Sequence, residues 1–169
     1  MKPRLRFPEN KIQDIASRYE YQLSEEELIA LRPNVLERGH LIKPELQKIT
    51  YWKAPRSSGH TAKNPDDYVV EITSFAFSAK FERSRIEILT LLYGVSWPTA
   101  SVILHFFHPD PYPIIDYRAL WSMRLEAPSY YHFDFWWTYV EFCRKFASRN
   151  GIDMRTLDRA LWQYSKENQ

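Results

Sequence analysis

Cysteine is nearly absent from the chain, and its scarcity excludes several kinds of site at once. Cys143 is the only cysteine among 169 residues, so the chain forms no internal disulfide. A zinc site or an iron–sulfur cluster held by several cysteines is excluded for the same reason. Cys143 itself lies in an apolar stripe and is expected to be an inert core residue.

Long apolar runs and a large net charge are lacking too. No apolar run reaches the ~18–20 residues that a membrane-spanning helix needs, and the basic N-terminal segment has no apolar region behind it. We therefore expect no membrane partner, no secretory signal and a cytoplasmic location. The net charge is only +2, from 23 Lys and Arg against 21 Asp and Glu. This mildly basic balance is compatible with a nucleic-acid partner but is not evidence for one.

What the chain does have is helical periodicity. Apolar residues make up 44% of the sequence, enough for one folded domain over residues 1–169. Apolar positions recur at helical spacing in residues 12–19, 68–76, 86–92, 136–147 and 154–164. The segment 102–107 is apolar on nearly every side and is predicted to be a central, buried helix. No alternating strand pattern stands out, so the predicted fold class is all-α.

Local signals predict some of the helix boundaries. Ser24 with Glu27 has the form of a capping box, and Pro33 is expected to interrupt the short helix that this box opens. Asn64 is predicted to cap the helix that follows it, because it precedes a proline and two acids that favour the positive end of a helix.

The stretch "LLYGVSWPTASVIL" at residues 91–104 joins two apolar helices through one of only four glycines in the chain. Gly94 is expected to take a positive φ and end the first helix, and Pro98 to lie in the first turn of the second. Val95 is predicted to point inward as an apolar plug. The backbone N–H groups that open the second helix then form an anion site. Taken alone, however, the turn favours an ordinary helical hairpin.

The next stretch, "HPDPYPIIDYRALWSM", adds a candidate catalytic residue. Three prolines at 109, 111 and 113 force an extended crossing, after which Ile114 and Ile115 enter the core. Asp116 follows them at the predicted start of a short helix. Its structural role is that of an N-cap. A carboxylate held between a buried apolar pair and an aromatic helix is also well fixed for chemistry.

Together the two stretches resemble the helix–hairpin–helix DNA glycosylase superfamily, the relatives of endonuclease III and the adenine glycosylases. That family has Leu-Pro-Gly-Val-Gly, small residues, an apolar helix, a proline-containing crossing and a catalytic Asp at a helix start. Here residues 92–96 are Leu-Tyr-Gly-Val-Ser, residues 99–101 are small, and Asp116 follows Pro98 by 18 residues (116 − 98), similar to the family's interval. The resemblance covers roughly residues 86–121. The same segment is similar to a small bacterial family of uncharacterised proteins, which adds no function.

The resemblance implies an enzyme that binds DNA and hydrolyses the N-glycosidic bond of a damaged or modified base, without a cofactor or metal. Asp116 takes the catalytic position, where a carboxylate stabilises positive charge on the sugar and orients or deprotonates the attacking water. Pro98 stands where the bifunctional members have Lys, so no Schiff base and no lyase activity are expected. Ser96 replaces the second glycine of the family pattern, which narrows the approach of a phosphate.

The candidate DNA-binding residues come from the turn, from the polar loop 54–64 and its flank, and from the helix after Asp116. They are Tyr93, Gly94, Val95, Ser96, Trp97, Thr99, Lys53, Arg56, Lys63 and Arg118. The loop is interpreted first as a solvated connection and alternatively as a substrate-facing segment.

A base that leaves the stack needs an aromatic pocket, although aromatic residues at helical spacing usually belong to the core. The pocket candidates are Tyr112, Tyr117 and Trp121, with Tyr130, Tyr131, Trp136 and Trp137 behind them. His105 and His108 are three apart, but no third ligand accompanies them, so no metal site is expected.

Three functions stay open on the sequence alone. The first is a monofunctional DNA glycosylase, the second a DNA-binding module that keeps the hairpin without the chemistry, and the third an α-helical protein-interaction domain. An Asp116 that faces the hairpin from the mouth of a cleft favours the first function. A buried Asp116 that only caps its helix favours the other two.

Overall fold

Helices are the only regular elements in residues 3–169, which the computed structural model describes, so the predicted all-α fold class is confirmed. The chain divides into two compact units. Unit 1 consists of residues 3–20 together with Pro111–Gln169, and unit 2 is the continuous segment Tyr21–Asp110. None of the helices within residues 3–169 is both long enough and apolar enough to cross a bilayer.

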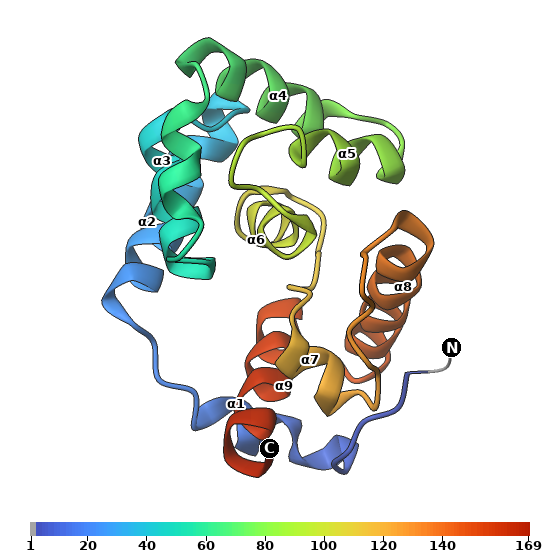
Figure 1. Cartoon of the computed structure of the whole chain (residues 1–169). Helices are drawn as coiled ribbons and strands as arrows, with labels where there is room; N and C mark the ends of the chain where they lie inside the picture. Colours follow the sequence, from blue (N-terminus) through green and yellow to red (C-terminus); the bar gives the residue numbers. More distant parts are fainter. Residues whose placement is uncertain (1–2) are drawn as a thin grey trace. The chain divides into compact units, whose positions relative to one another are not determined.

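Unit 2 is organised around one buried helix, α6. Its elements are α2 (Leu23–Arg38), α3 (Lys43–Lys53), the short 3-10 helix η2 (Ser58–Lys63), α4 (Asp66–Ser78), α5 (Glu82–Leu89) and α6 (Trp97–Phe107). Helices α2, α3 and α5 all contact α6, while α4 packs on α3 and α5 (Figure 1). Most residues of α6 are buried, which confirms the predicted central helix.

Two boundary predictions in α2 are wrong. The helix begins at Leu23 after the cap position Gln22, so Ser24 lies inside it and forms no capping box. Pro33 does not interrupt the helix, which continues to Arg38. Leu28 and Val35 are fully buried on either side of the proline, and their packing outweighs the one backbone hydrogen bond that Pro33 removes.

Unit 1 is organised around α9 (Met154–Asn168). Its other elements are η1 (Glu9–Lys11), α1 (Ile12–Ser17), α7 (Tyr117–Ser122) and α8 (Phe133–Arg149), and α9 contacts α1, α7 and α8 (Figure 1). The N-terminal segment is joined to the end of α7, because the N–H of Arg6 donates to the carbonyl of Ser122 at 2.8 Å. Cys143 is fully buried in α8, and this burial raises the pKa of its thiol.

The proline-rich segment leads into α7 without regular secondary structure over residues 111–116. Ile114 and Ile115 are buried as predicted, and the hydroxyl of Tyr139 donates to the carbonyl of Ile114 at 3.0 Å. These contacts fix the backbone immediately before Asp116, which is the cap residue of α7.

Candidate functional site

The turn between α5 and α6 (residues 90–96, here called the α5–α6 turn) has the local geometry that its sequence predicts. Gly94 adopts a φ of 81°, in the left-handed region that favours glycine. Val95 is 6% exposed, so the predicted plug points inward, and its N–H donates to the carbonyl of Leu92 at 3.0 Å. Pro98 lies in the first turn of α6. Val95 is thus buried, whereas Ser96, the cap residue of α6 that follows it, is exposed.

The N-terminus of α6 presents main-chain donors. Ala100 donates the first bond of the helical ladder, from its N–H to the carbonyl of Ser96 at 2.8 Å. The N–H groups of Trp97 and Thr99 precede that bond, at the end where the helix dipole is positive. Ser96 is the cap residue, and its hydroxyl makes no capping bond. Such an end favours an anion.

Thr99 contributes to this end through its backbone alone. Its side chain is 1% exposed, and its hydroxyl oxygen is buried without a hydrogen-bond partner. Leu91 and Tyr93 are the exposed large apolar side chains of the turn, at 59% and 60%, and Ser96 is exposed beside them. The surface at the turn thus combines main-chain donors with apolar and aromatic side chains.

Asn64 has a different role from the one predicted for it. The cap residue of α4 is Pro65, and the Asn64 side chain reaches the α5–α6 turn instead. Its Nδ2 donates to the carbonyl of Tyr93 at 3.0 Å and to that of Thr61 at 3.1 Å, while its Oδ1 accepts from the N–H of Tyr93 at 2.9 Å. Sequence reasoning missed this contact because the two residues are 29 positions apart.

The polar loop 54–64 packs against the turn at close range. A Cβ on Gly94 would lie 2.8 Å from Cγ2 of Thr61 and 3.3 Å from the carbonyl oxygen of Ser57. Much of the loop is ordered as η2, and Arg56 and Lys63 are exposed on it, with Lys53 at the end of α3. The loop that carries Arg56 and Lys63 therefore packs on the turn through Ser57, Thr61 and Asn64, whereas Arg118 lies in unit 1.

Asp116 lies in unit 1, at the start of α7. Its Oδ1 accepts a capping hydrogen bond from the N–H of Ala119 at 2.8 Å, and its side chain is partly exposed. The carboxylate also acts on neighbouring phenols. The pKa of Tyr131 is raised, first by burial and then by the charge of Asp116, and the same two causes contribute to the raised pKa of buried Tyr139. Asp116 is thus an N-cap, as its sequence position predicts, in aromatic surroundings.

The aromatic residues assigned to a base pocket differ in their surroundings. Tyr112 is 1% exposed and stacks on Trp136 at 5.8 Å, with the guanidinium of Arg144 4.4 Å from its ring. It is therefore a core residue as the chain is folded. Tyr117 is 56% exposed, and Arg118 lies 5.2 Å from its ring.

Trp121 lies at the end of α7, under the guanidinium of Arg6 at 4.3 Å and stacked on Tyr164 at 6.0 Å. It shares the exposed side of the short helix with Tyr117, four residues before it. Base binding by these three aromatic residues stays a prediction.

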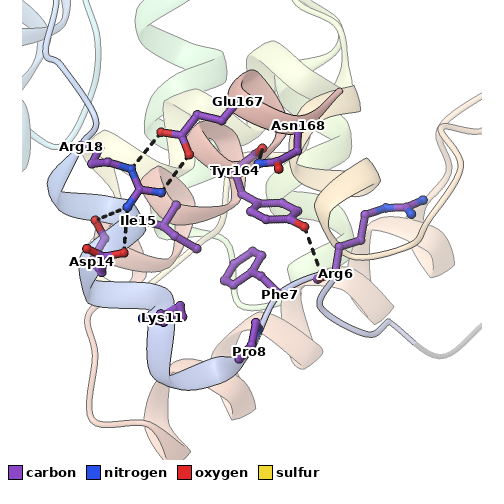
Figure 2. A pocket seen from close by; sticks show the side chains of 10 residues that line it. All are labelled: Arg6, Phe7, Pro8, Lys11, Asp14, Ile15, Arg18, Tyr164, Glu167 and Asn168. Carbon is purple, nitrogen blue, oxygen red and sulfur yellow. Dashed lines mark hydrogen bonds and ion pairs between the residues drawn. The ribbon is translucent and has the colours of Figure 1, made fainter.

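Unit 1 also contains a hollow of about 330 Å³ beside the N-terminal segment and the end of α9 (Figure 2). Phe7 and Tyr164 line it, and the centroids of their rings are 4.6 Å apart. Arg18 also lines the hollow and forms ion pairs with both Asp14 and Glu167, each at 2.8 Å. Opposite charges therefore meet within the hollow.

His108 has a structural role, and no metal site accompanies it in the part of the chain that the structure describes. Within residues 3–169, no three His, Cys, Asp or Glu side chains come close enough to hold a metal ion. His108 is 3% exposed, and its Nδ1 accepts from the N–H of Asp110 at 3.0 Å. Burial, followed by the charge of Arg85, lowers the pKa of His108.

Comparison of the chain with protein-family models, with curated proteins and with solved structures gave no match, so a function has to be argued from the residues and geometry described above.

Proposed function

We propose that the protein is a monofunctional DNA glycosylase that binds the DNA backbone through the α5–α6 turn and uses Asp116 to hydrolyse an N-glycosidic bond. The observation that carries the proposal is the turn: a glycine at φ 81°, a buried valine plug and a helix N-terminus whose cap residue, Ser96, makes no side-chain capping bond. A phosphate is the anion that such an end binds in nucleic acids.

The chemistry assigned to Asp116 requires an ionised carboxylate near the reacting sugar. Departure of the base builds positive charge on the sugar, and a carboxylate stabilises that charge while it orients or deprotonates water. Asp116 is partly exposed, and its Oδ1 accepts a hydrogen bond from the N–H of Ala119 at the N-terminus of α7. The turn belongs to unit 2 and Asp116 to unit 1, so the proposal assigns DNA contacts to both units.

The test is base release from duplex DNA that carries damaged or modified bases. We expect the parent protein to leave an intact abasic site that breaks only after treatment with alkali, because Pro98 provides no amine for strand cleavage. Asp116→Asn keeps an N-cap side chain and should abolish release while folding and DNA binding persist. Asp153→Asn is the matched control, since Asp153 caps α9 in the same unit by accepting from Thr156. Strand cleavage without alkali, or full activity in Asp116→Asn, would refute the assignment.

A non-catalytic DNA-binding module is the second candidate, and one observation favours it. Asp116 makes the same kind of capping bond as Asp153, so the cap alone accounts for its presence. Under this alternative the parent protein binds duplex DNA but releases no base from any substrate.

DNA binding itself is tested at the turn with Ser96→Glu. The new charge stands beside the main-chain donors and should weaken binding to duplexes of any sequence, because phosphate contacts carry no sequence information. Binding by the parent should fall as salt rises, with a shallow slope because the net charge is only +2. The measurement is fluorescence anisotropy across a salt series, after circular dichroism shows equal folding. Absence of salt-sensitive binding in the parent, or equal binding by Ser96→Glu, would leave a protein-interaction domain as the better assignment.

A further inference from the structure

The α5–α6 turn depends on a side chain outside it for part of its hydrogen bonding. Both main-chain groups of Tyr93 bond to the Asn64 amide, the N–H to Oδ1 at 2.9 Å and the carbonyl to Nδ2 at 3.0 Å. The second proton of Nδ2 goes to the carbonyl of Thr61 at 3.1 Å. Asn64 is 1% exposed, so its amide is shielded from water, although Tyr93 on the other side of two of these bonds is an exposed residue.

Only a short carboxamide satisfies this arrangement, because its oxygen has to accept one hydrogen bond while its nitrogen donates two. An aspartate of the same size would place an oxygen against two carbonyl oxygens. An apolar side chain would leave both main-chain groups of Tyr93 without this partner, while the carbonyl of Thr61 would keep only the backbone N–H of Asn64. Asn64 is therefore suited to the turn more than to α4, which it precedes without capping.

We propose that Asn64 is a positioning residue that holds the α5–α6 turn in its phosphate-binding conformation and joins the cationic loop 54–64 to it. Tyr93 directly precedes Gly94, the residue whose positive φ reverses the chain toward α6. Fixing the peptide groups of Tyr93 therefore fixes the direction in which the N-terminus of α6 points. Lys63, exposed and adjacent to Asn64, is held beside the turn by the same bonds. The inference rests on the proposed DNA-binding function.

The first experiment measures the free protein. In Asn64→Ala the N–H of Tyr93 loses its acceptor, and amide hydrogen exchange at Tyr93 and Val95 should accelerate by about tenfold or more, as loss of a buried hydrogen bond implies. Asn34→Ala is the matched control, because Asn34 is an exposed residue of α2 in the same unit. Unchanged exchange at the turn in Asn64→Ala would overturn the inference, whatever the protein does with DNA.

The second experiment measures DNA affinity for parent, Asn64→Ala and Asn34→Ala across a salt series. We expect Asn64→Ala alone to lose about tenfold in affinity. Its slope of log affinity against log salt should decrease by about 0.9, the value for one phosphate contact. A general loss of stability, corrected for the folded fraction, leaves that slope unchanged. Addition of Ser96→Glu to Asn64→Ala should cost less than it does in the parent, because the two changes remove the same contact.

The outcomes separate the inference from the function on which it rests. A parent that binds DNA while Asn64→Ala keeps the parental affinity and slope overturns the inference and leaves the proposed function standing. A parent without salt-sensitive binding overturns the proposed function and the positioning role with it, while the exchange data still show whether Asn64 orders the turn. If Asn64→Ala is largely unfolded, Asn64→Ser replaces it, since the shorter hydroxyl side chain removes the paired bonds to Tyr93 without placing a charge at a buried position.

Discussion

Gly94 has two independent reasons to be glycine. Its φ of 81° disfavours any side chain, and a Cβ at this position would lie 2.8 Å from Thr61. Gly39, the cap residue of α2, has a similar φ of 77°, but a Cβ there would meet nothing within 4 Å. A comparison of the two glycines therefore distinguishes the cost of backbone strain from the cost of close packing, within one unit.

We therefore expect Gly39→Ala to lower the free energy of unfolding by about 1–2 kcal/mol, the cost of the left-handed backbone alone. Gly94→Ala should cost about 1–3 kcal/mol more, because Thr61 and the loop have to move. Urea denaturation of the two variants and the parent provides the comparison. Equal losses in both variants would mean that the loop yields freely to the new methyl group.

At the scale of the element, apolar periodicity was sufficient to predict α1, α4, α5, α8 and α9, since each stripe is a local pattern that one packed face explains. The signals at the helix ends were less reliable. Ser24 and Glu27 match the sequence pattern of a capping box, yet Glu27 forms an ion pair with Lys48 of α3 at 3.1 Å. Asn64 likewise matches the sequence pattern of an N-cap, but its side chain forms hydrogen bonds with Tyr93. In both cases another residue occupies the cap position, Gln22 for α2 and Pro65 for α4, and the side chain bonds to a partner distant in sequence that spacing does not reveal.

The candidate site likewise has some features that local sequence predicts and others that depend on distant contacts. The positive φ of Gly94, the burial of Val95 and the cap at Asp116 follow from local sequence and are confirmed. The packing of the loop on the turn depends on tertiary contacts through Thr61 and was not predicted. The stacking of Tyr112 on Trp136 was equally out of reach, because Tyr112 lies between two prolines outside any periodic pattern and Trp136 belongs to a separate helix, α8.

Helix α2 allows a test of how strongly packing overrides propensity. Pro33 lies inside α2 and is exposed, so Pro33→Ala should restore a backbone hydrogen bond without disturbing the core. We expect the free energy of unfolding to rise by about 1–3 kcal/mol, less than the full helix-interior penalty of proline because alanine also loosens the unfolded chain.

The matched control is Pro44→Ala, at an exposed position in the first turn of α3, where proline costs the helix no bond. It should leave stability nearly unchanged or slightly lower. Thermal denaturation of both variants decides the point, and a Pro33→Ala protein no more stable than the parent would show that α2 is already adapted to its proline.

At the scale of the whole molecule, unit 1 is built from two separate parts of the chain. Residues near the N-terminus pack on α9, where the hydroxyl of Tyr164 donates to the carbonyl of Arg6 at 3.2 Å and Arg18 pairs with Glu167. The guanidinium of Arg18, helped by the amide of Gln163, lowers the pKa of Glu167 from 4.5 to about 2.

A carboxylate with a lowered pKa stabilises the folded state above its unfolded pKa, and that contribution is lost as the pH falls through the folded pKa. Glu167→Gln should therefore be less stable than the parent at neutral pH, with a difference that shrinks between pH 4.5 and about 2. Because the pair is largely exposed, the difference should be small and should decrease with added salt. Denaturation midpoints across this pH range test it, with Glu141→Gln on the exposed face of α8 as control. A constant difference down to acid pH would contradict the expectation.

The divided chain of unit 1 also sets an order of events during synthesis on the ribosome. Unit 2 is continuous and is complete once Asp110 has been made, whereas α1 has to wait for α9. Arg18 and Glu167 are 149 residues apart, an interval of roughly 7 to 30 seconds at the usual rate of translation. During that interval Ile12 and Ile15, buried in the finished fold, have no α9 to cover them, so the nascent N-terminal segment is the part of the chain most in need of a chaperone.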